Sequence, residues 1–286
     1  MENQKHLFQM HDDVHYLNCA YKSPLLKSSE KAAMKALEFA RNPSDMSSAD
    51  FFEDGKEARA LFGQLVNCNP LNVAIVPSTS YAFSSVLKNV KPKPEGKAIT
   101  LRDEFPSGYF SLQNWSQKND NEFVVIGATE DAEHQGRSWQ YNIINAIDES
   151  SSVVLMSYVH WMEGIAFDVK AIGEKCKAVG AVLIIDGSQS VGAIPIDVLD
   201  CHIDALVTVT YKWVFGAYSV TLAYISDAFA QGLPLEESWM NRSNAEDFTS
   251  LTNYDHNYMP HAGRYNVGQQ SNFILMPIVV AGLRQF

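Results

Sequence analysis

The chain has 286 residues, and its 22 lysines and arginines face 33 aspartates and glutamates, which gives a formal net charge of −11. With 46% hydrophobic residues it can bury a large core without disulfides or a structural metal, so the composition excludes a disordered chain and a coiled coil. The surplus of negative charge repels phosphate backbones, so we expect no nucleic-acid partner and expect any bound phosphate to be held locally.

The N-terminal segment, residues 1–26, carries no basic stretch followed by an apolar one and so does not resemble a secretory signal. The four cysteines, Cys19, Cys68, Cys176 and Cys201, show no C-x-x-C spacing, which favours reduced thiols over a disulfide framework or a zinc site. A cytoplasmic protein is expected.

Short apolar runs alternate with helical patterns along the chain. Strands are expected at 73–76, 98–101, 123–126, 153–157, 181–186, 205–209 and 220–225, and helices at 29–41, 51–66 and 169–179. Asp50 and Glu53 resemble a capping box for the second of these helices, and Gly180 ends the third. The alternation predicts an α/β fold with a mostly parallel seven-stranded sheet, helices on both faces, and ligands at the carboxyl ends of the strands.

Between Asp204 and Asp227 the only charged residue is Lys212, so this stretch could be mistaken for a membrane span. We reject that reading, because a lysine at the middle of a bilayer costs roughly 3 kcal/mol and the β-branched residues indicate two strands around a turn at Gly216. No membrane association is expected. An apolar helical pattern at 272–286 stops without a C-cap, and we expect the chain to be incomplete there.

Lys212 is a candidate for chemistry. Burial among apolar residues disfavours the charged form of an amine, and a neutral amine is what Schiff-base formation requires. The alternative is a lysine that extends its ammonium group to solvent from a strand end.

Asp186 closes an apolar strand, and a carboxylate there can keep a heteroaromatic ring nitrogen protonated. The alternative is an aspartate that only caps the following turn. A parallel crossover would bring Asp186 and Lys212 side by side. Ser78, Thr79 and Ser80 follow the first strand and open a helix, where backbone N–H groups and hydroxyls can hold a phosphate.

These pieces together resemble the pyridoxal-phosphate (PLP) enzymes of aminotransferase class V, which include cysteine desulfurases, kynureninases and isopenicillin N epimerase-like proteins. The resemblance is carried by the motifs at residues 16–25, 157–164, 186–192, 211–216 and 263–273. It implies the large domain of a fold-type I PLP-dependent transferase over 27–271, a helix at 272–286 that leads to a missing or truncated small C-terminal domain, and a homodimer with a shared active site.

The resemblance also implies roles for individual residues. Lys212 would form the internal aldimine and shuttle the α-proton, and Asp186 would pair with the pyridinium nitrogen. The remaining residues implied to bind the cofactor are Gln189 at the ring oxygen, Thr79 and Ser80 at the phosphate, Ser188, Phe105 over the ring face, Trp161 near the substrate side, Tyr211 beside the lysine, and Gln269 with Gln270 across the dimer interface.

Two departures from the family pattern are visible. Tyr211 stands before the lysine, as in kynureninase-like members, and the family's Gly-Thr turn reads Gly268-Gln269. The arginine that binds the substrate carboxylate in the family has no counterpart that we can assign. We therefore expect a PLP enzyme of the transaminase or lyase type that acts on an amino acid or amine, and keep as the alternative a non-catalytic or truncated dimeric interaction module.

Three weaker signals remain. His11 and His15 would share one face of a helix, but no third metal ligand is visible, so no metal site is expected. His160 follows a strand end and is either a tuning group or a hydrogen-bonded structural residue. Residues 236–255 are expected to form a long surface loop near the cofactor mouth or the partner subunit.

Overall fold

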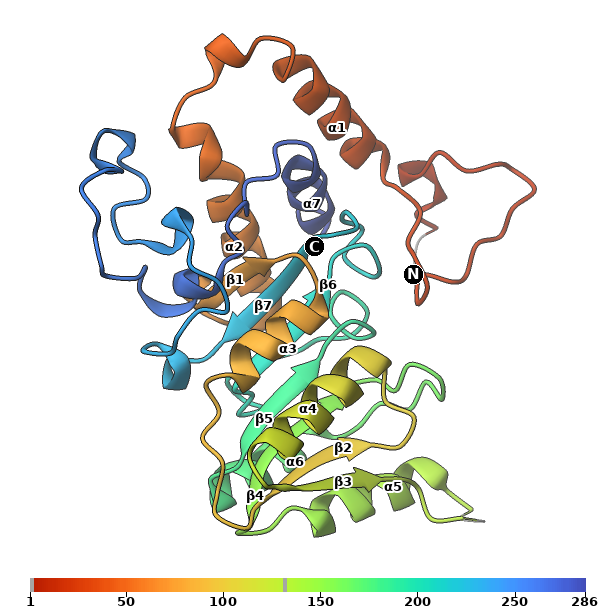
Figure 1. Cartoon of the computed structure of the whole chain (residues 1–286). Coiled ribbons are helices and arrows are strands. Elements are labelled where there is room, and N and C mark those ends of the chain that lie inside the picture. The colour runs from red at the N-terminus through yellow and green to blue at the C-terminus, as the bar shows by residue number, and fades with distance from the viewer. Residues whose placement is uncertain (1–2, 131–132) are drawn as a thin grey trace.

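The computed structural model describes residues 3–130 and 133–286, so the first two residues of the expected N-terminal segment lie outside the described part. Its centre is one seven-stranded sheet in the order β1-β7-β6-β5-β4-β2-β3 (Figure 1). The strands are β1 (Val73–Val76), β2 (Lys97–Leu101), β3 (Glu122–Ile126), β4 (Ser151–Ser157), β5 (Val182–Asp186), β6 (Ala205–Val209) and β7 (Thr221–Ile225).

The sheet is mostly parallel. The pairs β2–β3, β2–β4, β4–β5 and β5–β6 are parallel, and β7 is antiparallel to both β6 and β1. Because the direction reverses twice, β1 again runs with β6, and the carboxyl ends of six strands lie at one edge. The predicted sheet is confirmed. The expectation of one strand before and one strand after the turn at Gly216 is confirmed too, by β6 and β7.

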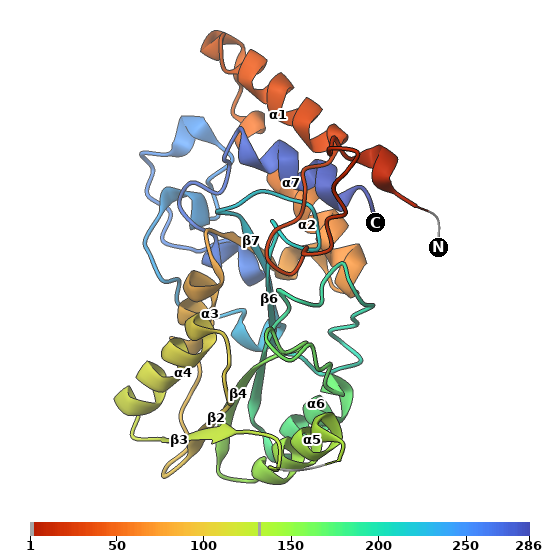
Figure 2. The same cartoon turned by 90° about the vertical axis from the view of Figure 1, so that its right-hand side faces the viewer.

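Helices cover both faces of the sheet (Figure 2). One face carries α3 (Thr79–Leu87) and α4 (Pro106–Lys118), and the other carries α2 (Glu53–Val66), α5 (Gln135–Ala146), α6 (Val169–Val179) and α7 (Leu275–Leu283). Each face has its own core. Phe83 and Leu112 are fully buried in the first, and Phe62, Ile143 and Ile172 in the second.

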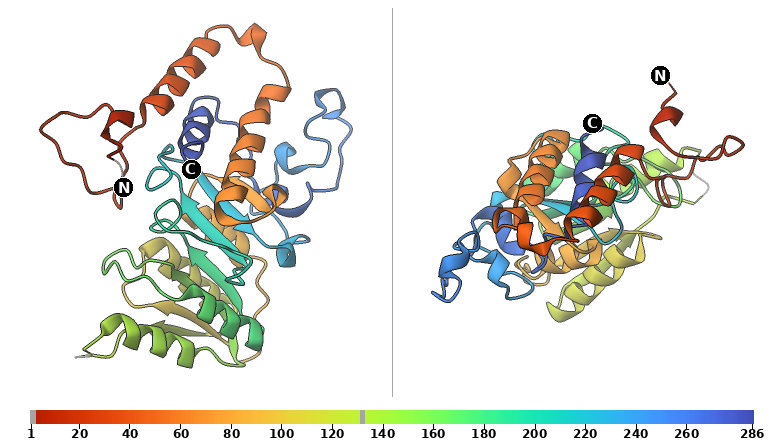
Figure 3. Two further views of the ribbon diagram at one scale, coloured as in Figure 1. Left: turned by 180° about the vertical axis from the view of Figure 1, so that it is seen from behind. Right: turned by 90° about the horizontal axis from the view of Figure 1, so that it is seen from above.

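Helix α1 (Lys27–Phe39) lies along α7 on the side away from the sheet (Figure 3). Its position is held by the apolar residues of α7 and by a hydrogen bond from Ser29 Oγ to the Ile278 carbonyl (3.4 Å). Within the described residues no helix combines the length and apolar character that crossing a membrane requires.

The predicted capping box is wrong. The Asp50 carboxylate accepts hydrogen bonds from Ser47 N (2.6 Å) and Ser47 Oγ (2.8 Å), and α2 begins after Phe52 with no side-chain cap. The reason is a short 3₁₀ helix, Ala49–Phe51, which separates Asp50 from the first turn of α2. Gly180 does end α6, with a left-handed φ of 67°.

Candidate active site

The candidate site lies at the carboxyl ends of the parallel strands. Asp186 is the last residue of β5, Lys212 lies three residues beyond β6, and Phe105 follows β2. The short connections after these strands turn toward the same edge, so three positions far apart in sequence meet there. Asp186 and Lys212 are 6% and 9% exposed, which makes both rare buried ionisable groups.

Lys212 is surrounded by groups that tune its amine. Its Nζ lies 5.7 Å from the centre of the Phe105 ring. Burial lowers the pKa of Lys212, and the nearby charge of Asp186 acts in the opposite direction. The amine is therefore easier to deprotonate than a surface lysine, which is the property that Schiff-base chemistry needs.

Asp186 is held by the turn that follows it. Its Oδ1 accepts a hydrogen bond from Ser188 N (2.8 Å). Burial raises the pKa of Asp186, while Ser188 and Lys212 favour its charged form. A buried carboxylate with so few donors can bind a further N–H group, and its direction is fixed by the strand.

Gln189 is bonded at both ends of its amide. Its Nε2 donates to the Ala20 carbonyl (3.0 Å), and its Oε1 accepts from Trp213 Nε1 (2.9 Å). Close by, the Tyr211 carbonyl accepts from Ser23 N (3.0 Å) and Ser23 Oγ (3.1 Å). Residues 16–23, which we call the N-terminal strap, are thus tied to the site on both sides of the lysine.

Aromatic rings form one wall of the site. Trp161 meets Phe105 edge to face, with ring centres 5.5 Å apart, and its Nε1 donates to the Asp103 carbonyl (2.7 Å). Tyr211 packs on Tyr218 with ring centres 4.9 Å apart. Phe105 and Trp161 remain 38% and 40% exposed, so this wall is partly open to solvent.

The first turn of α3 points its N–H groups toward the same edge, because β1 runs parallel to β6. Ser78 is the N-cap, and its Oγ accepts from Tyr81 N (3.2 Å) and contacts Ser80 Oγ (3.0 Å). The leading N–H groups of a helix have no partner within it, so this turn can bind an anion.

Two of the candidate residues lie elsewhere. Gln269 is exposed and lines a hollow of about 570 Å³ with Phe51, Trp239 and Phe273, and Gln270 is buried and hydrogen-bonded by Arg59. Trp239 and Phe248 of the segment 236–255 pack their rings against Phe51 here.

Sequence reasoning missed a buried ionisable residue next to Phe105, namely Glu104. It is 5% exposed, and its carboxylate accepts from Ser157 N (2.6 Å), Phe105 N (2.7 Å) and Ser157 Oγ. Burial and then the charge of Asp186 raise the pKa of Glu104 to about 7. No local signal singles it out, because Arg102 and Asp103 separate it from β2 and acidic residues are common in such turns.

Other signals resolve as structural features. His160 is 1% exposed, its Nδ1 accepts from Glu163 N (3.2 Å), and its Nε2 faces the Arg102 carbonyl (3.1 Å), so the ring is a neutral hydrogen-bonded element of its loop. His11 and His15 lie outside any helix. The described part of the chain brings no three His, Cys, Asp or Glu side chains together as a metal site.

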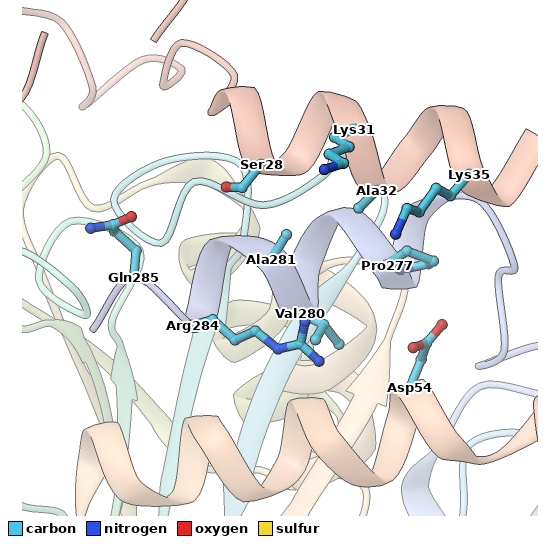
Figure 4. Close-up of a pocket in the computed structure, with 10 residues that line it drawn as sticks. All are labelled: Ser28, Lys31, Ala32, Lys35, Asp54, Pro277, Val280, Ala281, Arg284 and Gln285. Carbon is cyan, nitrogen blue, oxygen red and sulfur yellow. The ribbon is translucent and has the colours of Figure 1, made fainter. Parts of the chain in front are cut away.

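A separate pocket of about 430 Å³ lies between α1, α2 and α7 (Figure 4). It is lined by Lys31 and Lys35 of α1, Asp54 of α2 and Arg284, the residue that follows α7. Arg284 is already paired with Glu57 (2.6 Å). None of the candidate residues lies in this pocket, so it is distinct from the site described above.

The sequence is similar to proteins of a known family. The model of the aminotransferase class-V family matches residues 34–271. The uncharacterized aminotransferase YcbU of Bacillus subtilis (strain 168) is 28% identical over 229 residues, which cover 79% of this chain and 55% of that protein. A kynureninase of Geobacillus thermodenitrificans (strain NG80-2) is 24% identical over 238 residues, 80% of this chain and 54% of that protein. The chain thus spans about half the length of the curated relatives it matches.

Solved structures share the fold. C-DES, solved as a mutant with glycine covalently linked to its PLP cofactor, superposes with a TM-score of 0.84 at 16% identity over 99% of this chain and 74% of that one. The apo cysteine desulfurase of Thermococcus onnurineus NA1 gives a TM-score of 0.74 at 16% identity, over 96% and 67% of the two chains. The expected fold class is confirmed.

Proposed function

This chain belongs to the aminotransferase class V family, and we propose that it is a PLP-dependent enzyme that acts on an amino acid or an amine, with Lys212 as the residue that binds the cofactor covalently. The observation that carries the proposal is the buried pair of Lys212 and Asp186 beneath the exposed face of Phe105.

The chemistry of these groups fits PLP. A buried carboxylate that accepts a backbone hydrogen bond from Ser188 N suits a protonated pyridine nitrogen, and an amine with a lowered pKa suits the aldehyde carbon. The Phe105 ring offers a flat apolar surface for the pyridine ring, and the first turn of α3, with Thr79 and Ser80, offers N–H and hydroxyl donors for the phosphate. The ring nitrogen, the aldehyde, the ring face and the phosphate of PLP therefore each have a counterpart among these residues.

Bound PLP supplies an electron sink that stabilises negative charge on the substrate carbon next to the nitrogen. The residues of this chain hold and orient the reacting groups. Asp186 would face the ring nitrogen, and its negative charge would favour the protonated form of that nitrogen. When the Lys212 amine is not bonded to the cofactor, Nζ would accept and return a proton, since its lowered pKa leaves a larger fraction of the amine neutral. Tyr211 and Trp161 border the space that a substrate would occupy.

The proposal includes a homodimer with a shared site, to which Gln269 contributes from the partner's side. The exposed position of Gln269 supports this part. We further propose a large domain over 27–271, with 272–286 as the start of a helix toward a small domain, and a reducing, cytoplasmic location that agrees with four free thiols.

Absorbance spectroscopy tests the proposal. Purified protein with added PLP should show a near-visible band that borohydride reduces irreversibly, and Lys212→Ala should lack it. The matched control is Lys97→Ala, which removes a partly buried lysine at the opposite end of the sheet, where Lys97 pairs with Asp148 (2.7 Å). A folded wild-type protein without a reducible band would contradict the proposal and would favour a non-catalytic interaction module.

A further inference from the structure

Glu104 is a buried carboxyl group to which the proposed function gives no role. It lies in the turn after β2, and its two oxygens accept three hydrogen bonds: from Phe105 N (2.7 Å), from Ser157 N (2.6 Å) and from Ser157 Oγ. These donors belong to the ends of two neighbouring parallel strands. The side chain therefore joins the turn after β2 to the last residue of β4.

Both partners lead directly to the site. Ser157 is paired in register with Asp186, and the next residue, Tyr158, donates its N–H to the Asp186 carbonyl (3.1 Å). Phe105 carries the ring that lies over Lys212 Nζ. Glu104 thus connects the backbone of Phe105 to the end of β4, the strand that is paired with β5 beside Asp186.

Helix capping does not account for Glu104. Helix α4 begins at Pro106 with Phe105 as its N-cap, and the N–H groups that Glu104 accepts are those of Phe105 and Ser157, not those of the first turn of α4. Gly108 of α4 lies beside this side chain, because a Cβ added to Gly108 would lie 3.6 Å from Glu104 Cγ and 2.9 Å from Leu155 Cδ2. The three hydrogen bonds hold the carboxyl group in place.

The charges around the two carboxyl groups differ. Asp186 has Lys212 nearby to favour its negative charge, whereas the charge that acts on Glu104 is that of Asp186 itself. Its hydrogen-bond and packing contacts include the uncharged residues Ser157 of β4 and Gly108 of α4. Burial and the charge of Asp186 thus raise the pKa of Glu104 to about 7, whereas for Asp186 the upward shift caused by burial is opposed by Ser188 and Lys212.

We propose that Glu104 is a positioning residue. Through its hydrogen bonds to Ser157 and Phe105 it holds the Phe105 ring over Lys212 and the end of β4 beside Asp186. It thereby sets the orientation of a bound pyridine ring and the affinity for it. This inference rests on the proposed function, because it assigns Glu104 a role toward PLP. Glu104 touches no reacting atom and is not a catalytic residue.

The test uses the full chain with Glu104→Gln, Ser157→Ala and, as a matched control, Glu122→Gln, which changes an exposed glutamate at the start of β3. Glu104→Gln keeps the size of the side chain but cannot accept all three hydrogen bonds. We expect it to form the reducible band, since Lys212 is intact, but to bind PLP about tenfold more weakly, as the loss of one hydrogen bond to a buried carboxyl implies. Its visible circular dichroism should weaken and the pH midpoint of its band should shift, and Ser157→Ala should change in the same direction.

A readout without cofactor separates the inference from the proposed function. The ring of Phe105 contacts Trp161, so the part of the apo-protein fluorescence that Trp161→Phe removes reports the position of Phe105. Glu104→Gln should change that part of the emission even before PLP is added. If the wild type forms no band, the proposed function fails, and the fluorescence still tests the positioning.

A folded Glu104→Gln protein with unchanged PLP affinity, dichroism, pH midpoint and Trp161 emission would overturn the inference and leave the proposed function standing. If Glu104→Gln does not fold, Ser157→Ala decides, because it removes only one hydroxyl. Wild-type values for that variant in all four measurements would overturn the inference equally.

Discussion

The raised pKa of Glu104 makes the stability of the protein depend on pH in a way that one substitution can isolate. The unfolded chain releases this proton near pH 4.5, and the folded protein holds it until about pH 7. Between these values the folded state binds more protons than the unfolded state, so raising the pH destabilises the fold. The contribution is fully present below pH 4.5 and is lost as the pH rises through about 7.

The size of the effect follows from the two values. Each pH unit over which only the folded state keeps the proton changes the free energy of unfolding by about 1.4 kcal/mol, so the whole window corresponds to about 3 kcal/mol. Glu104 is 5% exposed, and solvent screening reduces this figure little. Glu104→Gln has no proton to release, so the variant should not show this loss.

Urea unfolding of apo protein at a series of pH values from 4.5 to 8 provides the assay. We subtract the unfolding free energy of Glu104→Gln from that of the wild type at each pH. This difference should fall by about 3 kcal/mol across the series. The hydrogen bond lost in the variant adds a constant to the difference and does not change this fall. Glu122→Gln, on an exposed glutamate, should run parallel to the wild type. If the wild-type and Glu104→Gln curves are parallel too, Glu104 is already ionised at low pH, and the reasoning about its burial is refuted.

Three further predictions concern packing, capping and thiol chemistry. Gly173→Ala should destabilise the fold by roughly 3 kcal/mol or prevent folding, because the new Cβ would lie 1.9 Å from the Cys201 carbonyl oxygen. Gly180→Ala meets no neighbouring atom and should cost only roughly 1 kcal/mol, because alanine disfavours the left-handed backbone there. Equal losses of stability in thermal melts would contradict this prediction. Asp168→Ala should destabilise α6 by about 1 kcal/mol, as measured by urea unfolding, because its carboxylate accepts the Ala171 N–H (3.0 Å); an unchanged midpoint would show that the cap contributes nothing. A thiol reagent at pH 8 should modify Cys19 before Cys176, whose pKa burial raises to about 12, and mass spectrometry that finds Cys176 modified first in folded protein would refute that order.

The sequence predicts the sheet well, because its strands are continuous apolar runs bounded by turn residues. All seven lie within two residues of their expected ends. Helices α4 and α5 are harder to locate, since only a few of their residues, such as Leu112 and Ile143, face the core. The misassigned cap at Asp50 arose because a local pattern cannot distinguish a 3₁₀ turn from the first turn of a helix.

Only part of the candidate site can be predicted from the sequence, because some of its contacts follow from the order of the strands and others do not. The proximity of Asp186 and Lys212 follows from parallel topology, which the strand pattern already implies. The strap contacts at Gln189 and Tyr211 depend on residues more than 160 positions away, and no local pattern reports such pairs. Glu104 was overlooked because its neighbours Phe105 and Pro106 read as a turn, where an acidic residue is ordinary.

The wide sequence spacing of these contacts has a consequence for biosynthesis. Ser23 and the Tyr211 carbonyl are 188 residues apart, and β1 finds its strand partner only in β7. At translation rates of about 5 to 20 residues per second, the strap emerges from the ribosome roughly 10 to 40 s before the carbonyl that will bind it. Strand β1 likewise has no partner until β7 has been synthesised, and an unpaired strand edge in a nascent chain favours aggregation.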